Sequence, residues 1–211
     1  MNTKTVKDFD KEAAQWDANP GRVKLASDVA TAIIKNVKLK KNMAALDFGC
    51  GTGLLTLKIQ PFVKMIMGVD TSHGMLNMLQ KKIDGPGLTN VSTQHVDFEK
   101  GERVDGLYDL IISSMVLHHI SDTAALFKVW RNLLQPNGQI CFADLDTEDG
   151  EFHGDNTGVH HFGFDREKLK KLLVETGYCD VRDSTATIVK REIEGKPSRE
   201  FPIFLITATR E

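Results

Sequence analysis

Five short apolar runs that alternate with helical patterns constrain the fold of this chain more than any other feature of its sequence. The runs are MAALDF, MIMGVD, VSTQHVDF, YDLIISSM and QICFADL, between residues 43 and 145. Parallel strands need long crossover connections, usually helices, and these helices cover both faces of the sheet. The alternation therefore predicts an α/β fold in which a mostly parallel sheet lies between two layers of helices.

Apolar residues spaced three or four positions apart predict the helices that flank these strands. One set spans residues 26–37, a second spans residues 75–83, and a third spans residues 126–134. We expect the third helix to begin at Ser121 and to stop at QPNG, because proline and glycine end helical patterns. The three helices supply the layers that cover the predicted sheet.

The C-terminal third departs from the alternation. After a polar loop over residues 146–163, we predict a helix with Asp165 as its N-cap and Gly177 just past its end. Segments 180–192 and 199–210 are rich in β-forming residues and are separated by the turn-forming EGKPS. We expect them to pair as an antiparallel hairpin at one edge of the sheet. The complete prediction is a Rossmann-like three-layer α/β/α sandwich with a seven-stranded, mostly parallel sheet.

Length and charge favour one domain and a small-molecule partner. The 211 residues are 41% hydrophobic, which is enough for the core of one α/β domain. We divide them into a helical lead-in (1–40), a cofactor-binding half (41–146), and a substrate-side loop, helix and hairpin (147–211). The 27 basic and 29 acidic residues are interspersed and give a net charge of -2. This balance argues against nucleic acid as the partner.

The cysteines and the apolar segments indicate the compartment. Cys50, Cys141 and Cys179 are odd in number, far apart and free of C-x-x-C spacing, which favours a reducing compartment over a disulfide framework or zinc ribbon. The N-terminal residues lack an apolar core of signal-peptide length, and no run of about 18 apolar residues occurs. We therefore expect a cytoplasmic protein without a membrane span, as a monomer or homodimer.

The stretch LDFGCGTGLL carries three glycines at every second position directly after the first predicted strand. Gly49, Gly51 and Gly53 let the chain turn tightly and let a ligand approach the backbone without a side chain in the way. The dinucleotide fingerprint G-x-G-x-x-G needs its third small residue where this chain has Leu54. The loop therefore predicts a nucleoside ligand other than a nicotinamide or flavin dinucleotide.

Acidic and polar residues stand at the ends of the next three predicted strands. Asp70 ends the second strand, 21 residues after Gly49, at the distance expected of a carboxylate that accepts hydrogen bonds from a ribose diol. Asp97 and Phe98 end the third strand and suit an exocyclic amine and a base face. The fourth strand ends in SSMVLHHI. Because ligands of open α/β sheets bind beyond the carboxyl ends of the strands, these residues predict one nucleoside site.

The order of these motifs resembles the class I S-adenosylmethionine-dependent methyltransferases. The match runs from D-x-G-x-G-x-G through GVD, VDF and YDLIISSMVLHHI to LLQPNGQICFADLD. FDKEAAQWDANPGRVKLA and FGFDREKLKKLLVETGY are similar to the small-molecule branch that includes ubiquinone and menaquinone biosynthesis methyltransferases. The resemblance implies S-adenosyl-L-methionine as cofactor, S-adenosyl-L-homocysteine as product, and in-line transfer of a methyl group to a small-molecule acceptor.

The resemblance also implies which residues contact the cofactor. The glycine loop with Asp47 would face the methionyl part, Asp70 the ribose, and Asp97 with Phe98 the adenine. Met75 and Leu117 would form apolar walls, Ser114 would offer a backbone contact, and Trp16 and Arg22 of the lead-in would close over the cofactor, with Arg22 pairing its carboxylate. The full cofactor set is Asp47, Gly49, Cys50, Gly51, Gly53, Asp70, Thr71, Met75, Asp97, Phe98, Ser114, Leu117, Trp16 and Arg22.

Histidines dominate the two segments expected beside the cofactor. His118 or His119 is the predicted catalytic proton acceptor for a hydroxyl or acidic-carbon substrate, because imidazole titrates near pH 6.5. Ser114, His118, His153 and His161 are predicted to line the acceptor pocket. We expect the adjacent histidines, if they lie on a regular strand, to point to opposite faces, and we predict no metal site. In DLDTEDG, Asp149 stands where a calcium loop needs glycine.

Several readings stay open at this point. SSMV stands where methyltransferases of DNA bases carry an Asn or Asp followed by two prolines, which disfavours such a substrate, and it lacks the acidic ligands of magnesium-dependent catechol enzymes. The acceptor atom, whether oxygen, nitrogen, carbon or sulfur, is not specified. The alternatives are an NAD(P)-dependent oxidoreductase of the same fold, opposed by the misplaced third glycine, and a non-catalytic cofactor-binding partner subunit.

Overall fold

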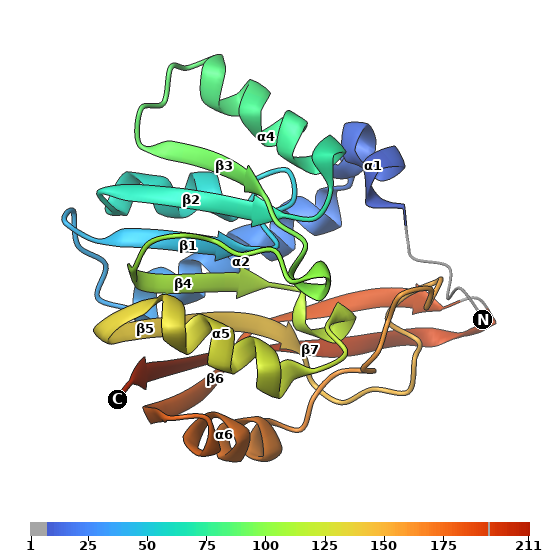
Figure 1. Cartoon of the computed structure of the whole chain (residues 1–211). Helices are drawn as coiled ribbons and strands as arrows, with labels where there is room; N and C mark the ends of the chain where they lie inside the picture. Colours follow the sequence, from blue (N-terminus) through green and yellow to red (C-terminus); the bar gives the residue numbers. More distant parts are fainter. Residues whose placement is uncertain (1–7, 194) are drawn as a thin grey trace.

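A seven-stranded sheet with the order β3-β2-β1-β4-β5-β7-β6 runs through the protein (Figure 1). The computed structural model describes residues 8–193 and 195–211. Neighbouring strands among β1 to β5 pair in parallel, whereas β7 pairs antiparallel with both β5 and β6. The strands are β1 (Ala44–Phe48), β2 (Met65–Asp70), β3 (Val91–His95), β4 (Tyr108–Ser114), β5 (Leu134–Leu145), β6 (Tyr178–Ile193) and β7 (Lys196–Arg210). The predicted Rossmann-like sheet with an antiparallel C-terminal hairpin is confirmed.

Helices cover both faces of the sheet. The longer ones are α2 (Pro20–Asn36), α4 (His73–Asp84), α5 (Thr123–Leu133) and α6 (Arg166–Glu175), and the short ones are α1 (Phe9–Glu12), η1 (Ala13–Ala18), α3 (Thr56–Ile59), η2 (Gln60–Phe62), η3 (Phe98–Lys100) and η4 (Leu117–His119). One core packs α2, α3 and α4 against the sheet, with Ile33 and Leu79 buried. The other packs α5 and α6, with Trp130 and Leu173 buried. The three expected layers follow from these two cores.

The strand register places alternate side chains in the two cores. Along β1, Ala45 belongs to the core of α2 to α4, and Leu46 belongs to the core of α5 and α6. Both side chains are fully buried because β1 pairs with β2 on one side and with β4 on the other. The strand order reverses between β1 and β4, and this is the place where open α/β sheets bind their ligands.

Side-chain caps fix where the helices begin. The Asp165 carboxylate accepts a hydrogen bond from the Lys168 backbone N–H at 3.1 Å, so the predicted N-cap of α6 is confirmed. Helix α5 begins one residue later than Ser121 predicts, because its N-cap is Asp122, which accepts from the Ala125 N–H at 2.9 Å. An aspartate cap ionised at neutral pH also interacts well with the helix dipole.

Several strand boundaries differ from the sequence prediction, and three of the differences have a clear cause. β3 ends at His95 rather than at Phe98, because Asp97 caps the short helix η3. β5 begins at Leu134, so QPNG ends the helix but continues as strand, with Asn137 in a left-handed conformation at φ 62°. β7 begins at Lys196, inside the predicted turn. Turn-forming residues mark a change of direction, but tertiary pairing decides how far a strand extends.

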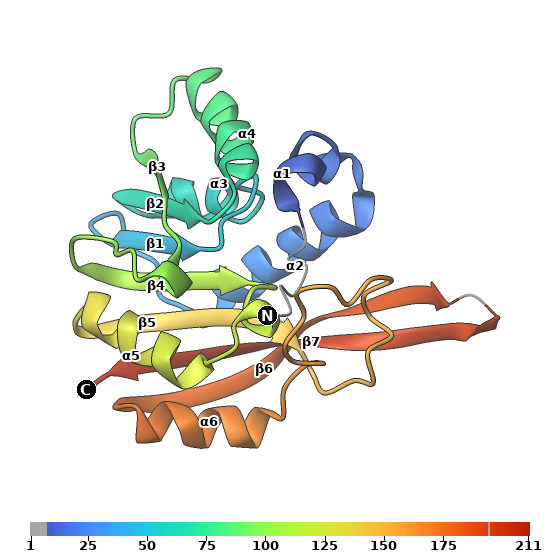
Figure 2. The same cartoon turned by 45° about the vertical axis from the view of Figure 1, so that its right-hand side comes forward.

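The C-terminal hairpin extends well beyond the carboxyl edge of the parallel strands (Figure 2). β5 pairs with β7 only from Gln139 to Leu145, which pair with Thr209 and Ile203. Beyond that point β6 and β7 pair only with each other, as far as Ile193 opposite Lys196. The distal half of the hairpin therefore forms a side wall next to the carboxyl edge of the sheet.

The lead-in docks over the same carboxyl edge. The Asp10 carboxylate accepts hydrogen bonds from the Ser72 hydroxyl at 2.5 Å and from the Gly74 backbone N–H at 2.7 Å. Asp17 accepts one from the Thr52 hydroxyl at 2.6 Å. Helices α1 and η1 are thereby joined to the N-terminus of α4 and to the glycine loop. In the described part of the chain, no helix is long and apolar enough to cross a membrane.

Candidate cofactor and active site

Two of the three loop glycines are required by close packing. The backbone N–H groups of Gly49 and Cys50 both donate to the Val69 carbonyl oxygen, which turns the chain sharply at the end of β1. Gly49 has φ 70°, and an added Cβ would lie 2.4 Å from a Val116 methyl carbon. Gly53 has φ 82°, and its Cβ would lie 2.3 Å from a Leu79 methyl carbon. A side chain at either position would collide with the core as well as strain the backbone.

Gly51 differs, because the space beside it is open. Its φ is 53°, and a Cβ built there has no described atom within 4 Å. Packing against the protein therefore does not explain a glycine at this position. A bare backbone that faces open space at the carboxyl edge of the sheet suits close approach by a ligand, and this geometry fits a nucleoside cofactor.

Asp70 connects the glycine loop to the end of β2. Its carboxylate accepts hydrogen bonds from the Gly51 N–H at 2.8 Å and from the Ser72 N–H at 2.9 Å. Burial raises the pKa of Asp70, and the backbone N–H groups oppose that shift. Each carboxylate oxygen has two lone pairs, so the group retains acceptor capacity for a ribose diol.

Asp47 turns away from the loop and into the protein. Its buried carboxylate accepts a hydrogen bond from the Thr56 hydroxyl at 2.6 Å. Burial raises the pKa of Asp47 to about 7, and the charge of Asp70 adds to the shift. The expectation that Asp47 faces the methionyl group stays a prediction, but the hydrogen bond to Thr56 occupies one of its oxygens.

The residues expected around the adenine come together at the ends of β2 and β3. The Val96 N–H donates to the Asp70 carbonyl oxygen at 3.0 Å, which aligns the two strand ends. The Phe98 ring lies 4.8 Å from the Phe48 ring between centroids, and Met75 is buried. Asp97 lies 2.8 Å from the Lys100 ammonium. Leu117 is also buried, in the core of α5 and α6.

Trp16 and Arg22 lie against each other in the lead-in. The Arg22 guanidinium carbon is 3.7 Å from the centroid of the Trp16 ring, and Arg22 pairs with Glu12 at 3.0 Å. The Phe9 ring lies 6.0 Å from the Trp16 ring and 5.5 Å from the His119 ring. The lead-in thus contacts the histidines as well as the glycine loop. Asp10, Asp17 and Phe9 were not predicted as site residues, because no local motif marks these long-range contacts.

His118 and Asp144 form a fully buried pair at the carboxyl ends of β4 and β5. The Nδ1 atom of His118 lies 2.8 Å from an Asp144 carboxylate oxygen, and the His118 backbone N–H also donates to this carboxylate. Burial alone would raise the pKa of Asp144, but the charge and hydrogen bond of His118 hold it below its usual value. Within the described residues, the Nε2 atom of His118 has no hydrogen-bond partner. In the neutral imidazole tautomer that donates its Nδ1–H to Asp144, Nε2 carries the lone pair.

Three histidine rings gather at this position. The ring of His118 lies 4.1 Å from that of His119 and 4.8 Å from that of His153. Met115, at φ 59°, turns the chain out of β4, and the two adjacent histidines lie in the short helix η4 rather than on a strand. This turn explains why their rings lie side by side instead of on opposite faces. Across the described residues, no group of three or more His, Cys, Asp or Glu side chains has a metal-binding arrangement.

The loop 146–163 is fastened to η4. The backbone N–H groups of His160 and His161 donate to the His118 carbonyl oxygen. The His161 ring nitrogen Nε2 lies 2.9 Å from the Ile120 carbonyl oxygen, and His119 Nδ1 lies 2.8 Å from the Gly158 carbonyl oxygen. The rings of His118, His119 and His153 therefore lie side by side. His161 is attached to the same segment by hydrogen bonds to its backbone.

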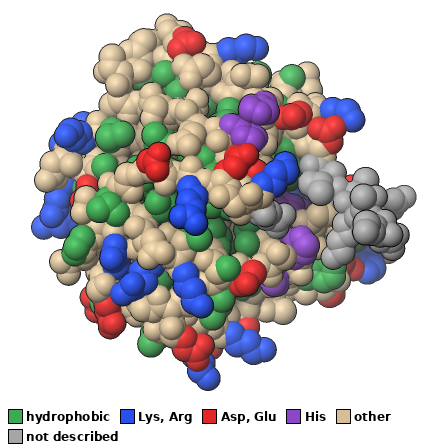
Figure 3. Space-filling view, viewed as in Figure 1, with side chains coloured by type: hydrophobic (Ala, Val, Ile, Leu, Met, Phe, Trp, Pro, Cys, Tyr) green, Lys and Arg blue, Asp and Glu red, His purple; other side chains and the backbone are tan. Residues whose placement is uncertain are grey.

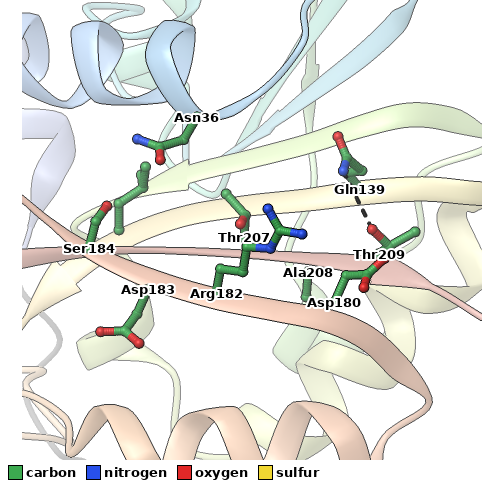
Figure 4. Close-up of a pocket in the computed structure, with 10 residues that line it drawn as sticks. Asn36, Gln139, Asp180, Arg182, Asp183, Ser184, Thr207, Ala208 and Thr209 are labelled. Atoms are coloured by element: carbon green, nitrogen blue, oxygen red, sulfur yellow. Dashed lines mark hydrogen bonds between the residues drawn. The ribbon is translucent and has the colours of Figure 1, made fainter.

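A separate groove of about 170 Å³ lies at the other end of the sheet (Figure 4). Asn36 at the end of α2 and Arg182 on β6 contribute to its lining, and Gln139 donates a hydrogen bond to the Thr209 hydroxyl. Gln139 lies where β5 joins the parallel sheet, and the glycine loop lies beyond the opposite, carboxyl ends of the strands. This polar groove is therefore not part of the candidate cofactor site.

Known proteins share both the sequence pattern and this fold. The family described as "Methyltransferase domain" matches residues 45–138. An uncharacterized methyltransferase of Schizosaccharomyces pombe is 31% identical over 72% of this chain and 59% of its own length. A ubiquinone biosynthesis O-methyltransferase of Colwellia psychrerythraea is 23% identical over 69% of this chain and 65% of its own length. The chain thus spans less than two thirds of either relative.

Solved structures place the fold in the same group. The complex of DhpI with SAH superimposes with a TM-score of 0.72 at 18% identity, over 96% of this chain and 92% of that one. A methyltransferase solved with the Trm112 activator of Haloferax volcanii superimposes with a TM-score of 0.76 at 14% identity, over 97% of this chain and 99% of that one. The sheet order, the glycine loop and these matches define the class I S-adenosylmethionine-dependent methyltransferase superfamily. Residues 45–138 match the methyltransferase domain, and the fold is that of this superfamily, as the sequence analysis predicts.

Proposed function

We propose that the chain binds S-adenosyl-L-methionine and transfers its methyl group to a small-molecule acceptor. The open space beside Gly51, at the carboxyl edge of the sheet where the Asp70 carboxylate accepts from the Gly51 N–H, is the observation that carries the cofactor proposal. Asp70 would accept from the ribose hydroxyls, and Met75 with Phe98 would flank the adenine. The remaining cofactor contacts are proposed for Asp47, Gly49, Cys50, Gly53, Thr71, Asp97, Ser114, Leu117, Trp16 and Arg22.

The buried pair of His118 and Asp144 supports proton transfer from the acceptor. Bound S-adenosyl-L-methionine supplies an activated, electrophilic methyl group. Asp144 accepts from the Nδ1–H of neutral His118, and the buried, unpartnered Nε2 would take the proton of a substrate hydroxyl once the acceptor reaches it. The carboxylate also stabilises the imidazolium that forms, as in other carboxylate–histidine pairs. We assign the base to His118 ahead of His119, whose Nδ1 bonds to a backbone carbonyl.

The acceptor pocket is proposed to lie beside this pair. His153 lies next to His118, and Ser114 ends β4 three residues before η4. His161 joins the same segment through its backbone and ring contacts. His118 is buried, whereas Ser114, His153 and His161 are partly exposed, so an acceptor bound among them would displace water and be held in a fixed attack geometry.

Turnover measurements test the acceptor pocket. Ser114, His118, His153 and His161 are each replaced by alanine, and methyl transfer and cofactor affinity are measured separately across an acceptor panel. We expect lower turnover with nearly unchanged affinity for S-adenosylhomocysteine, because these side chains are assigned to the acceptor. Unchanged turnover in all four variants would refute the assignment.

Ligand titrations and turnover measurements on the parent protein distinguish the alternatives that the sequence analysis leaves open. Titration with NADPH checks the oxidoreductase alternative, for which we expect no binding. Tight binding of S-adenosylhomocysteine without turnover on any acceptor would favour a non-catalytic partner subunit instead. We also propose a cytoplasmic monomer or homodimer that does not act on nucleic acid. The three free cysteines and the intermixed charges in Figure 3 support these last proposals.

A further inference from the structure

Arg191 is an exposed residue on the distal half of the hairpin, directly opposite Arg199 on β7. Its guanidinium carbon is 4.2 Å from the centroid of the Phe152 ring. No hydrogen bond or ion pair joins Arg191 to any residue in the described ranges 8–193 and 195–211. The stem and head of Arg191 are therefore held over a buried aromatic ring without an acidic partner.

A second arginine faces it from α2. Burial lowers the pKa of Arg191, and the positive charge of Arg22 lowers it further. The two elements are joined by the Thr187 hydroxyl, which donates to the Asp28 carboxylate at 2.7 Å. Arg22 has Glu12 as its partner at 3.0 Å, so the positive charge in excess belongs to Arg191. Two guanidinium groups close enough for their charges to interact attract an anion.

Arg199, on the opposite strand of the hairpin, has both an aromatic ring contact and acidic partners. Its guanidinium lies over Phe201 at 5.1 Å and pairs with Asp149 at 2.5 Å and Glu151 at 2.8 Å. Arg199 thus combines a ring contact with full charge compensation by the protein. Among the described residues, Arg191 has the ring contact without that compensation, so its guanidinium is open to an anion from solution.

Chains of contacting rings connect the two arginines to the histidine cluster. The Phe152 ring lies 4.9 Å from the His153 ring, which lies 4.8 Å from the His118 ring. On the other side, Arg22 lies over Trp16, and Phe9 lies between Trp16 and His119. Both cations therefore lie at the outer ends of aromatic walls that begin at the proposed base.

We propose that Arg191 forms an anion subsite for the acceptor, and that the acceptor carries a carboxylate or phosphate group. This inference rests on the proposed methyl transfer at His118. The planar guanidinium fork matches either anion with two parallel hydrogen bonds. The anion fixes one end of the acceptor while its reactive hydroxyl lies next to His118. The aromatic walls suit an apolar or aromatic body between the two ends.

Titration calorimetry with simple probes tests this subsite. The protein is first saturated with S-adenosylhomocysteine, and phenyl phosphate, benzoate and neutral benzyl alcohol are then titrated separately. We expect phenyl phosphate or benzoate to bind more tightly than benzyl alcohol, and the stronger of the two anions identifies the group. In Arg191→Gln, anion affinity should fall about tenfold or more, because a charge-assisted hydrogen bond is lost. Arg191→Lys should retain part of the anion affinity.

Lys190→Gln is the matched control, because it removes one positive charge from the neighbouring position of β6, whose side chain points to the opposite face of the hairpin, and its anion affinity should match that of the parent protein. Equal anion affinity in the parent and in Arg191→Gln, or no preference for anions over benzyl alcohol in the parent, would overturn the inference. A parallel loss of S-adenosylhomocysteine affinity in Arg191→Gln would also overturn it and assign the arginine to the cofactor carboxylate. Failure of the parent to bind S-adenosylhomocysteine would refute the proposed function itself.

Discussion

Replacing Asp47 by asparagine should make the stability of the protein less dependent on pH. Asp47 is fully buried, and its pKa is about 7 in the folded protein against 3.8 as the ordinary value. The folded state therefore binds a proton more tightly than the unfolded state between these two values. By linkage, stability falls as pH rises through this window, because the unfolded state then holds fewer protons.

The magnitude follows from the size of the shift. About three pKa units correspond to about 4 kcal/mol of lost stability once pH exceeds 7. Between pH 5 and pH 8 the parent protein should lose about 2–3 kcal/mol that Asp47→Asn does not lose. Asparagine keeps an oxygen that accepts from the Thr56 hydroxyl, so the packing of the strand is retained. Any buried N–H that remains unpaired shifts stability by an amount independent of pH.

Urea unfolding at several pH values measures this difference. With a slope of about 2–3 kcal/mol per molar urea, the midpoint gap between Asp47→Asn and the parent should change by about 1 M from pH 5 to pH 8. Asp28→Asn is a control whose gap should not vary from pH 5 to pH 8: burial opposes the shift, but bonds from Lys24 and Thr187 hold the pKa of Asp28 below 3.8, so this carboxylate is ionised in both states over that range. A gap for Asp47→Asn that does not vary with pH would refute the reasoning.

Three further predictions follow from single contacts. Gly53→Ala should reduce stability by about 2–4 kcal/mol in urea unfolding, since its Cβ would collide with Leu79; a loss under 1 kcal/mol would contradict the packing argument. Asp144→Asn should lower turnover about a hundredfold or more at unchanged S-adenosylhomocysteine affinity, because His118 loses its orienting carboxylate; full turnover would contradict it. Asp10→Ala should increase hydrogen exchange in residues 8–18, and unchanged exchange would show that its bonds do not hold the lead-in.

Local sequence patterns predict most of the fold because strands and helices have different periods. β2 has the predicted boundaries at Met65 and Asp70, since a polar segment and a turn bracket its apolar run. β5 begins earlier than its apolar run, because pairing of Leu134 with Tyr108 is a tertiary contact. The antiparallel hairpin is confirmed at the sheet edge, but its extension past the parallel strands has no local signal.

The candidate site likewise combines residues that a local motif marks with contacts that no local motif marks. The glycine loop and His118 are evident from motifs, whereas the pairing of His118 with Asp144 joins residues that are 26 positions apart. A signal for this pair does exist, because Asp144 stands at the end of the fifth predicted strand, next to the fourth in a parallel sheet. No comparable signal marks Asp10 or Arg191, whose partners lie on distant elements.

Titration calorimetry of S-adenosylhomocysteine against the parent protein and Gly51→Ala tests the central claim most directly. Gly51 has open space beside it, so alanine costs only about 1–2 kcal/mol of backbone strain and does not collide with the core. We predict one-to-one binding by the parent protein and a large loss of affinity in Gly51→Ala, with the variant still folded at 25 °C. Absence of binding by the parent, or equal binding by Gly51→Ala, would contradict the placement of the cofactor over this loop.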